Sequence, residues 1–153
     1  MAQTAPYVLA AGVFVLFTAT PDQMRHYWLN RYFPEALQRA IQQMPAYEMV
    51  HAALSTAGFS TVQTEPYCVT PDLQDCFLYA GKYRPELYLS AAVRCGISTF
   101  AALADAAEVA RGCTQLRADL ESGRIAAVIA ASENENGDYL FVVATKRDST
   151  LDG

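Results

Sequence analysis

The sequence predicts an α/β fold in which a three-stranded mixed sheet is flanked by helices and carries a helical insert. Two short runs, residues 13–17 and 139–144, are apolar at every position and rich in β-branched and aromatic residues. This pattern is typical of strands buried on both faces. A third segment, residues 59–69, alternates in part, as a strand nearer a sheet edge does. Helical spacing of apolar residues fills the stretches between these strands.

Length and composition predict a single domain over residues 1–153, with the insert at about residues 71–132. Of 153 residues, 52% are hydrophobic and 18% are charged, so a chain of this size can bury a substantial core. No internal repeat, low-complexity run or Pro/Gly/Ser linker divides it.

Charge and hydropathy argue against nucleic acid and membranes as partners. The net charge is −5, and the 11 lysine and arginine residues are scattered singly. The apolar stretch near the start is interrupted by Gly12 and is shorter than the roughly 20 residues that cross a bilayer. No positive charge occurs in residues 1–6, as a signal peptide would require, so we expect a cytoplasmic protein.

The four cysteines give no pattern of metal ligation. They form no CxxC pair, and only His26 and His51 could join them as ligands. We therefore expect no metal and interpret them as reduced thiols in the core of a cytosolic protein. They are Cys68, Cys76, Cys95 and Cys113.

A helix should follow the first strand directly. Thr20 and Gln23 have the spacing of a capping box, and Pro21 suits the first helical position. Apolar residues then recur at helical spacing up to residue 44, while Pro34 should kink or restart the helix and Pro45 should end it.

The remaining elements follow from periodicity. We expect a helix over residues 47–57 capped by Gly58, and a polar turn over residues 133–137 before a strand at 138–145. Asp72 and Asp75 open a predicted helix and are interpreted as capping residues, not as a catalytic carboxylate pair. Because the last strand is the more apolar, we expect it to lie between the first two. The helices predicted within the insert cover residues 72–80, 91–95, 99–104, 106–120 and 124–131.

This order of elements resembles the carboxyl-terminal part of class I S-adenosylmethionine-dependent methyltransferases, in a type 11-like subgroup that acts on small molecules. The resemblance is carried by Ala10-Ala11-Gly12, where that family has Pro-Gly-Gly, and by Thr20-Pro21-Asp22-Gln23-Met24. Residues 138–144 and the insert sequence at 78–89 are also similar. It implies that the final strand is central and antiparallel, and that the insert lies on the side of the methyl acceptor.

The family's cofactor signature does not occur in this sequence. The family holds its cofactor with a Gly-rich loop after one strand and an acidic residue after the next. The two closest glycines here are Gly112 and Gly123, so there is no G-x-G pair. We therefore expect no cofactor bound by this chain alone, and methyl transfer only if another chain complements it.

Two aromatic groups are candidates for binding a small molecule. By resemblance, the helix after the first strand and the insert form the acceptor side of the pocket, and Arg84 could bind a carboxylate in bidentate fashion. Ordinary packing of aromatic residues, and a structural turn at Arg84, explain the same residues equally well. His26 could act as a general base, or could simply be an exposed or packed histidine. The candidate substrate-binding residues are Tyr27, Trp28, Tyr32, Tyr79, Arg84 and Tyr88.

The strand that begins at Val13 and ends at Phe17 should also serve in association, because a bare apolar edge favours pairing with another chain. In one interpretation the chain is a non-catalytic homodimer that binds a small molecule or has an assembly role, with this strand paired to its own copy. In the other it is the substrate-side subunit of a split methyltransferase, and a partner chain completes the sheet along the same edge.

Overall fold

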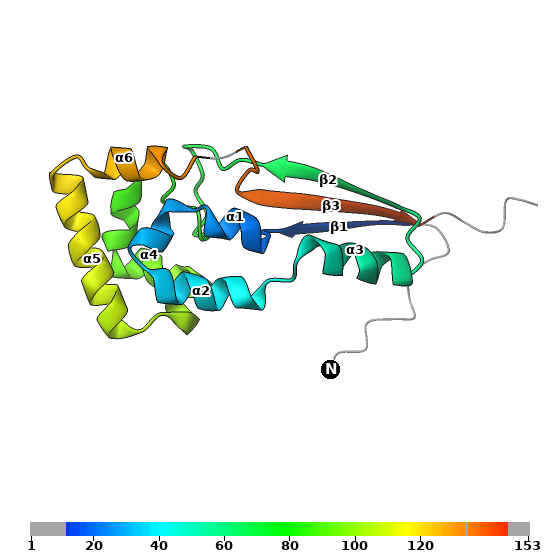
Figure 1. Cartoon of the computed structure of the whole chain (residues 1–153), viewed down its shortest axis with the longest axis horizontal. Helices are drawn as coiled ribbons and strands as arrows, with labels where there is room; N and C mark the ends of the chain where they lie inside the picture. Colours follow the sequence, from blue (N-terminus) through cyan, green and yellow to red (C-terminus); the bar gives the residue numbers. More distant parts are fainter. Residues whose placement is uncertain (1–11, 134, 147–153) are drawn as a thin grey trace, which may run out of the picture.

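The computed structural model describes residues 12–133 and 135–146. The sheet lies at one end of an elongated molecule, and most helices gather at the other (Figure 1). The strands are β1 (Gly12–Thr18), β2 (Thr61–Tyr67) and β3 (Tyr139–Lys146). The helices are α1 (Pro21–Arg25), α2 (Pro34–Gln43), α3 (Tyr47–Thr56), α4 (Ala91–Gly96), α5 (Ala106–Glu121) and α6 (Ile125–Ala130), with 3₁₀ turns at Trp28–Arg31 and Pro85–Leu89 and a π-helical turn at Thr99–Leu103.

The strand order is β1-β3-β2, which confirms that the last strand is central. Thr18 of β1 lies opposite Leu140, and Tyr67 of β2 lies opposite Tyr139. The expectation of a mixed sheet is wrong. Strands β1 and β2 run in the same direction, but β3 lies between them, so they form no parallel pair. Both hydrogen-bonded pairs in the sheet are antiparallel.

The capping box after β1 is present as predicted. The Gln23 amide N–H donates to Thr20 Oγ1 over 3.2 Å, and the Thr20 amide N–H donates to Gln23 Oε1 over 2.9 Å. The helical stretch then breaks into α1, a 3₁₀ turn and α2, which restarts at Pro34. Proline is pre-organised for the first helical position, so the predicted break falls there.

A distant carboxylate caps α2. The N-cap residue Phe33 has no side chain that can accept a hydrogen bond from the first amides of α2. Glu108 of α5 fills this role and accepts from the amides of Glu35 at 2.7 Å and Ala36 at 3.1 Å. The buried Glu108 carboxylate therefore satisfies helix amides that would otherwise lack partners.

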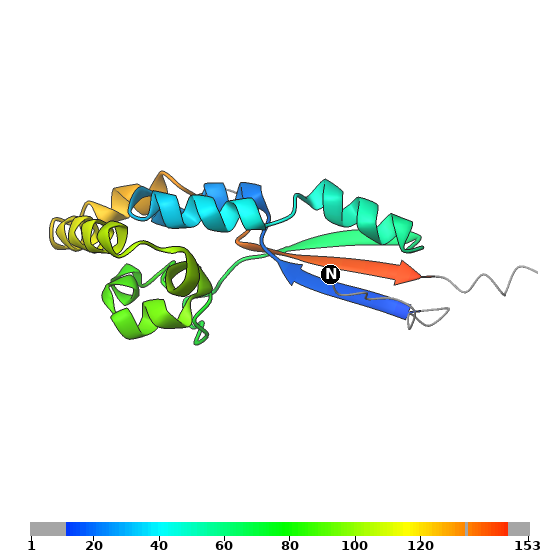
Figure 2. The ribbon, with the colours of Figure 1, turned by 90° about the horizontal axis from the view of Figure 1, so that it is seen from below.

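Helix α3 covers one face of the sheet. Leu54 packs against Val142 and Ala144 of β3 in a small apolar cluster. Figure 2 shows α3 alongside this face, and no described helix lies over the opposite face of the sheet. Gly58 ends the α3 segment with φ of +86°, a conformation that glycine adopts without strain.

Strand β1 is exposed, so the expectation that it is buried on both faces is wrong for the described chain. Val13 is 66% exposed and Val15 is 57% exposed, on the face opposite α3. Within the described residues, β3 is the one strand that pairs with β1, and no second layer packs on that face. Its apolar side chains are therefore available for contact with further protein.

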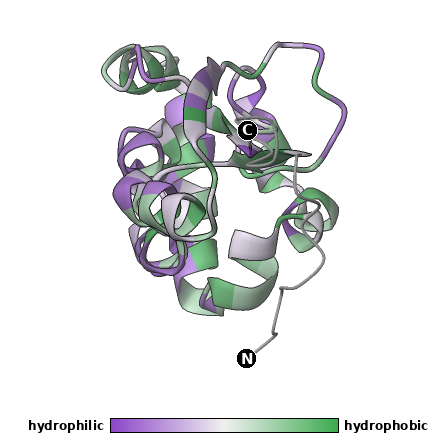
Figure 3. Cartoon of the chain, turned by 90° about the vertical axis from the view of Figure 1, so that its right-hand side faces the viewer, coloured by the Kyte–Doolittle hydropathy of each residue, from purple (hydrophilic) through white to green (hydrophobic). Residues whose placement is uncertain are grey.

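The main core lies in the helical end of the molecule. Leu29, Phe33 and Leu37 are fully buried and pack with Tyr88 of the insert and Leu116 of α5. The helices carry both hydrophobic and hydrophilic residues (Figure 3). This is the pattern of helices that cover a core on one side and meet solvent on the other.

The helix predicted over residues 72–80 is wrong. This segment consists of turns, in which the Leu73 amide donates to Thr70 and the Ala80 amide to Phe77. Such bonds span three residues, as in β-turns, and Tyr79 within the segment is buried. Asp72 and Asp75 therefore cap no helix. The other four helical segments predicted in the insert are confirmed, one of them as the π-helical turn.

Three of the four cysteines also differ from expectation. Cys68, Cys76 and Cys95 are exposed and not in the core, while Cys113 is half-buried. All four are free thiols.

Within residues 12–133 and 135–146, no cluster of three or more histidine, cysteine or acidic side chains could hold a metal ion. In the same residues, no helix is long and apolar enough to cross a membrane.

Candidate functional site

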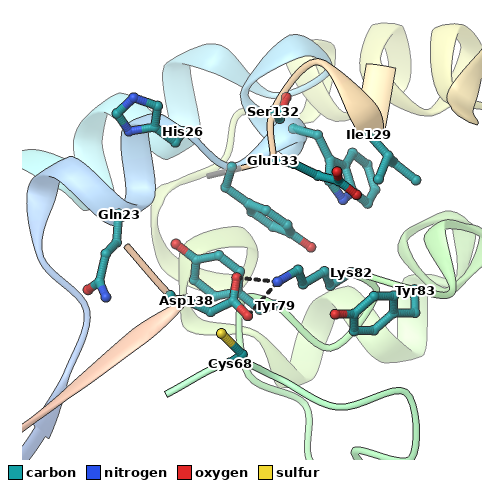
Figure 4. A pocket seen from close by; sticks show the side chains of 13 residues that line it. Gln23, His26, Cys68, Tyr79, Lys82, Tyr83, Ile129, Ser132, Glu133 and Asp138 are labelled. Carbon is teal, nitrogen blue, oxygen red and sulfur yellow. Dashed lines mark hydrogen bonds and ion pairs between the residues drawn. The ribbon is translucent and has the colours of Figure 1, made fainter. Parts of the chain in front are cut away.

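A cavity of about 230 Å³ lies at the end of the sheet where β1 and β2 end and β3 begins (Figure 4). Its walls come from the segment after β1, from Cys68 after β2, from the insert, and from the residues between α6 and β3. Polar and aromatic side chains line it together, among them Gln23, Tyr27, Trp28, Tyr79, Lys82 and Asp138.

Gln23 joins two of these walls. Its side-chain amide donates to the carbonyl of Asn136 at 2.8 Å and to that of Tyr139 at 3.0 Å. The Oε1 atom of the same amide accepts from the Thr20 backbone. One buried side chain therefore closes the start of α1 and also fixes the turn before β3.

Lys82 and Asp138 form the polar end of the pocket (Figure 4). The Lys82 ammonium lies 2.8 Å from Asp138 Oδ1 and 2.7 Å from Oδ2. Asp138 Oδ2 also accepts from the Val69 amide at 2.8 Å. Burial opposes the charged form of Lys82, but hydrogen bonding and the charge of Asp138 outweigh it, so the pKa of Lys82 is raised.

Aromatic rings form the apolar wall. The Tyr27 ring lies 4.2 Å from that of Tyr79 and 5.3 Å from that of Trp28, measured between centroids. The Tyr27 hydroxyl lies 2.6 Å from the Tyr88 hydroxyl. Tyr88 does not line the cavity; its ring lies 5.7 Å from that of Trp28 and supports the wall from behind.

Tyr88 also fixes the insert segment that carries Tyr79. Its hydroxyl accepts from the Gly81 amide at 3.1 Å and donates to the carbonyl of Leu78. A Cβ atom at Gly81 would lie 2.3 Å from the Tyr88 ring, so only glycine fits there. The position of Tyr79 is thus set by backbone contacts on both sides of it.

The tyrosines in this region remain protonated. Burial is the main cause that raises the pKa of Tyr27, Tyr79, Tyr88 and Tyr139 well above 10, and the nearby Asp138 carboxylate adds to it. Their hydroxyl groups are therefore neutral hydrogen-bonding groups at physiological pH.

Two buried donor atoms of residues that line the pocket have no partner. Among the described residues, Trp28 Nε1 and the Tyr79 hydroxyl are the buried side-chain polar atoms that make no hydrogen bond. Trp28 is 3% exposed and Tyr79 is 1% exposed. Each such group costs about 1–3 kcal/mol. Neighbouring protein atoms cover both donors, so neither is accessible from the cavity in this structure.

The structure gathers only some of the residues predicted from sequence. Tyr27, Trp28 and Tyr79 line the pocket, and Tyr88 supports it. Tyr32 instead donates its hydroxyl to Asp119 of α5 at 2.8 Å, away from the pocket. A substrate-binding role for these residues stays a prediction.

Arg84 is engaged elsewhere. Its guanidinium donates to the carbonyl of Leu73 at 2.5 Å, and Arg84 does not line the pocket. Arg84 does lie in a turn, the alternative that the sequence left open, because its amide donates to the carbonyl of Gly81 at 3.1 Å and the 3₁₀ turn Pro85–Leu89 follows. His26 lies at the rim, is exposed, and its Nδ1 is 2.8 Å from the carbonyl of Asp22.

Sequence reasoning missed Lys82 and Asp138 as pocket residues. The two lie 56 positions apart, and neither belongs to a recognisable motif. Gln23 was recognised only as a cap, because its contacts with Asn136 and Tyr139 depend on the tertiary fold.

Comparison with known proteins gives one informative match. No family model matches the chain, and no curated protein matches it significantly. A solved structure from Anabaena variabilis ATCC 29413, described as a "putative methyltransferase from antibiotic biosynthesis pathway", superposes with a TM-score of 0.72 at 33% sequence identity. The match covers 87% of this chain and 54% of that one. The chain therefore has a methyltransferase-like fold and spans about half the length of this neighbour.

Proposed function

We propose that this chain binds a small molecule in the aromatic pocket and represents the acceptor-binding part of a methyltransferase-like protein. The observation that carries the proposal is the cavity itself, where the aromatic residues Tyr27 and Trp28 line the space together with the largely buried Lys82–Asp138 pair. Small-molecule sites are typically hollows with mainly apolar walls and a few fixed polar groups. The likeness to a protein described as a methyltransferase suggests that the bound molecule is a methyl acceptor.

The described residues do not fit S-adenosylmethionine. Neither β1 nor β2 leads into a Gly-rich loop; Ala19 and Thr20 follow β1, and Cys68 follows β2. The amide of Gln23 at the start of α1 is already occupied by the capping box. We therefore assign binding, and no chemical step, to this chain by itself.

Strand β1 supports a second candidate, the substrate-side subunit of a split methyltransferase. Its exposed Val13 and Val15 suit continuation of the sheet, and the chain matches only 54% of its neighbour. A partner chain would then supply the cofactor site. Pairing of β1 with the same strand of a second copy is the alternative, and it gives a non-catalytic homodimer.

The single tryptophan makes the binding proposal directly testable. Trp28 is the only tryptophan in the chain, so its fluorescence reports on the pocket alone. We expect some members of a panel of small metabolites to change this fluorescence in a saturable way. In a control variant that combines Trp28→Phe with Met49→Trp, the tryptophan moves to an exposed position on α3, and the response should disappear. A flat response to every compound would overturn the proposal.

Calorimetry separates the two candidates. S-adenosylmethionine and S-adenosylhomocysteine should give no heat with the chain alone. If the chain is a subunit, heat should appear after mixing with a polypeptide that corresponds to the uncovered part of the Anabaena protein. Heat with the chain alone would contradict the statement that these residues do not fit the cofactor.

A further inference from the structure

A groove on the surface of the helical end gathers positive charge. Arg25 of α1, Arg31 of the 3₁₀ turn and Arg124 before α6 line it, and its volume is about 570 Å³. Within the described chain, no aspartate or glutamate is among its lining residues. The whole chain carries a net charge of −5, so composition does not account for three arginines in one groove. Such a surface attracts anions.

A buried carboxylate fixes two of these arginines. Asp119 of α5 is fully buried, and its Oδ2 lies 3.9 Å from Arg31 Nε while its Oδ1 lies 3.3 Å from Arg124 Nε. The Tyr32 hydroxyl and the Gln115 side-chain amide donate to the same carboxylate at 2.8 and 3.0 Å. Because both arginines contact one immobile carboxylate, their guanidinium groups lie side by side.

The two guanidinium groups keep most of their donors for a ligand. Each approaches Asp119 with its Nε atom, and the side chains of Arg31 and Arg124 remain 53% and 57% exposed. The Nη groups at the far ends carry four of the five N–H donors of an arginine. Their planar arrangement matches the oxygens of a carboxylate or a phosphate.

Neutralisation of Asp119 alone does not explain this arrangement. One arginine would balance the charge of Asp119, which also accepts hydrogen bonds from Tyr32 and Gln115. The second arginine adds a positive charge that has no carboxylate of its own. Arg25 lies 2.6 Å from Asp22, but both side chains are more than half exposed, so this ion pair contributes little and can give way to a ligand.

The balance of charge and the walls of the groove select the class of anion. Counted with their ion-pair partners Asp119 and Asp22, the three arginines leave one positive charge in excess. A carboxylate neutralises this excess, whereas a phosphate monoester, with a charge of about −1.5 to −2 at pH 7, exceeds it. Ala127 and Val128 of α6 line the same groove and provide an apolar wall.

We propose that this groove binds a small organic monocarboxylate. The carboxylate bonds to the Nη groups of Arg31 and Arg124, and the apolar body of the ligand lies against Ala127 and Val128. Neither arginine lines the aromatic pocket, so the inference goes beyond the function proposed for that pocket and does not depend on it.

Three probes test this class: hexanoate has a carboxylate and an apolar body, hexan-1-ol has the same body without charge, and inorganic phosphate is an anion without an apolar body. Arginine Nε–H signals in a ¹⁵N–¹H spectrum of the whole chain report on the groove. Hexanoate should move the signals of Arg31 and Arg124 in a saturable way and bind roughly tenfold more tightly than the other two probes. Added salt should weaken this binding.

Arg31→Gln and Arg124→Gln assign these signals and test the contacts. Each variant removes one guanidinium and keeps the other as a counter-charge for Asp119, and each should bind hexanoate roughly three- to tenfold more weakly. Arg117→Gln is the matched control, because it removes the same charge from an exposed position of α5 that does not line the groove. Circular dichroism checks the fold, and if a variant does not fold, the titration of the wild type decides.

Equal binding of hexanoate and hexan-1-ol would overturn the proposal, because the arginines would then select no anion. Tighter binding of phosphate would overturn the carboxylate class. Unchanged hexanoate binding in Arg31→Gln and Arg124→Gln, or no saturable shift in the wild type, would overturn the site. None of these outcomes decides whether the aromatic pocket binds a ligand, since that cavity involves neither arginine.

Discussion

The Lys82 ammonium contacts both carboxylate oxygens of Asp138, at 2.8 and 2.7 Å, and so joins the insert to the residue that precedes β3. Both side chains are largely buried, with exposed fractions of 24% and 8%. Asp138 continues the strand pairing as well, because its amide donates to the carbonyl of Tyr67 at 2.9 Å. The contact therefore ties the pocket wall to the edge of the sheet.

Asp138→Asn should destabilise the protein by about 1–3 kcal/mol, because it leaves the Lys82 ammonium buried without its counter-charge. Urea denaturation followed by circular dichroism measures the change. Glu35→Gln is the control: its contacts with Arg39 and Arg111 are exposed and 3.4 Å long, so the loss should stay within about 0.5 kcal/mol. Equal losses in the two variants would contradict a special role for the buried pair.

Tyr79→Phe should stabilise the unliganded protein by about 1 kcal/mol, because it removes a buried hydroxyl that has no partner. Tyr88→Phe makes the same chemical change at a hydroxyl bonded to Tyr27, Gly81 and Leu78, and should cost about 1–3 kcal/mol. Thermal melts of the two variants beside the wild type give the comparison. A loss of stability in Tyr79→Phe would indicate that its hydroxyl already has a partner.

Stability should fall as the pH rises above about 10. Burial, as the main cause, raises the pKa of Tyr27, Tyr79 and Tyr139 in the folded state, so above pH 10 the unfolded chain releases protons that the folded chain retains. Below pH 10 both states are protonated and the stability does not change through these groups. Lys82, whose pKa is also raised, acts in the same direction.

The measurement is a pH titration that follows tyrosinate absorbance together with circular dichroism. The buried tyrosines should ionise together with unfolding. Full ionisation of all tyrosines while the circular dichroism remains native would show that the buried hydroxyls reach solvent in the folded state.

Strand β1 should mediate association. Val15→Lys places a charge on the exposed apolar face of this strand, and we expect it to shift the protein toward monomer in sedimentation velocity. Met49→Lys is the control, because Met49 is 67% exposed on α3, which covers the face of the sheet opposite Val15. A wild-type protein that is monomeric at all concentrations would contradict association through this strand.

Gly112 should tolerate no side chain. An added Cβ would lie 2.4 Å from the Phe33 ring and 2.4 Å from the carbonyl of Tyr32, so Gly112→Ala should cost about 1–3 kcal/mol. Gly12→Ala meets no atom within 4 Å and should change stability by less than about 0.5 kcal/mol. Urea midpoints report both, and a neutral Gly112→Ala would mean that α5 shifts away from the 3₁₀ turn.

Local signals explain what could be predicted from the sequence. The capping box at Thr20 and Gln23 and the restart at Pro34 act within a few residues, and both are present. The central last strand followed from the high apolar content of residues 139–144. The helix expected over residues 72–80 failed because burial of Tyr79 determines that segment, and no local pattern encodes this contact.

The site was predicted only in part, for the same reason. Tyr27, Trp28 and Tyr79 could be proposed from aromatic clustering. Lys82 and Asp138 meet only through the tertiary fold, and Arg84 is bound to the carbonyl of Leu73. Some polar side chains face a cavity, and others are satisfied by nearby backbone groups. Contacts between distant segments decide between these two outcomes.

The strand order has a consequence for synthesis. Both β1 and β2 pair only with β3 among the described strands, and β3 is the last described element to leave the ribosome. Until it emerges, the apolar β1 has no described pairing partner and the sheet cannot nucleate. Such long-range pairing slows folding and exposes unpaired strands to aggregation. The nascent chain should therefore depend on chaperones more than a helical protein of equal length, and should acquire its sheet in a single late step.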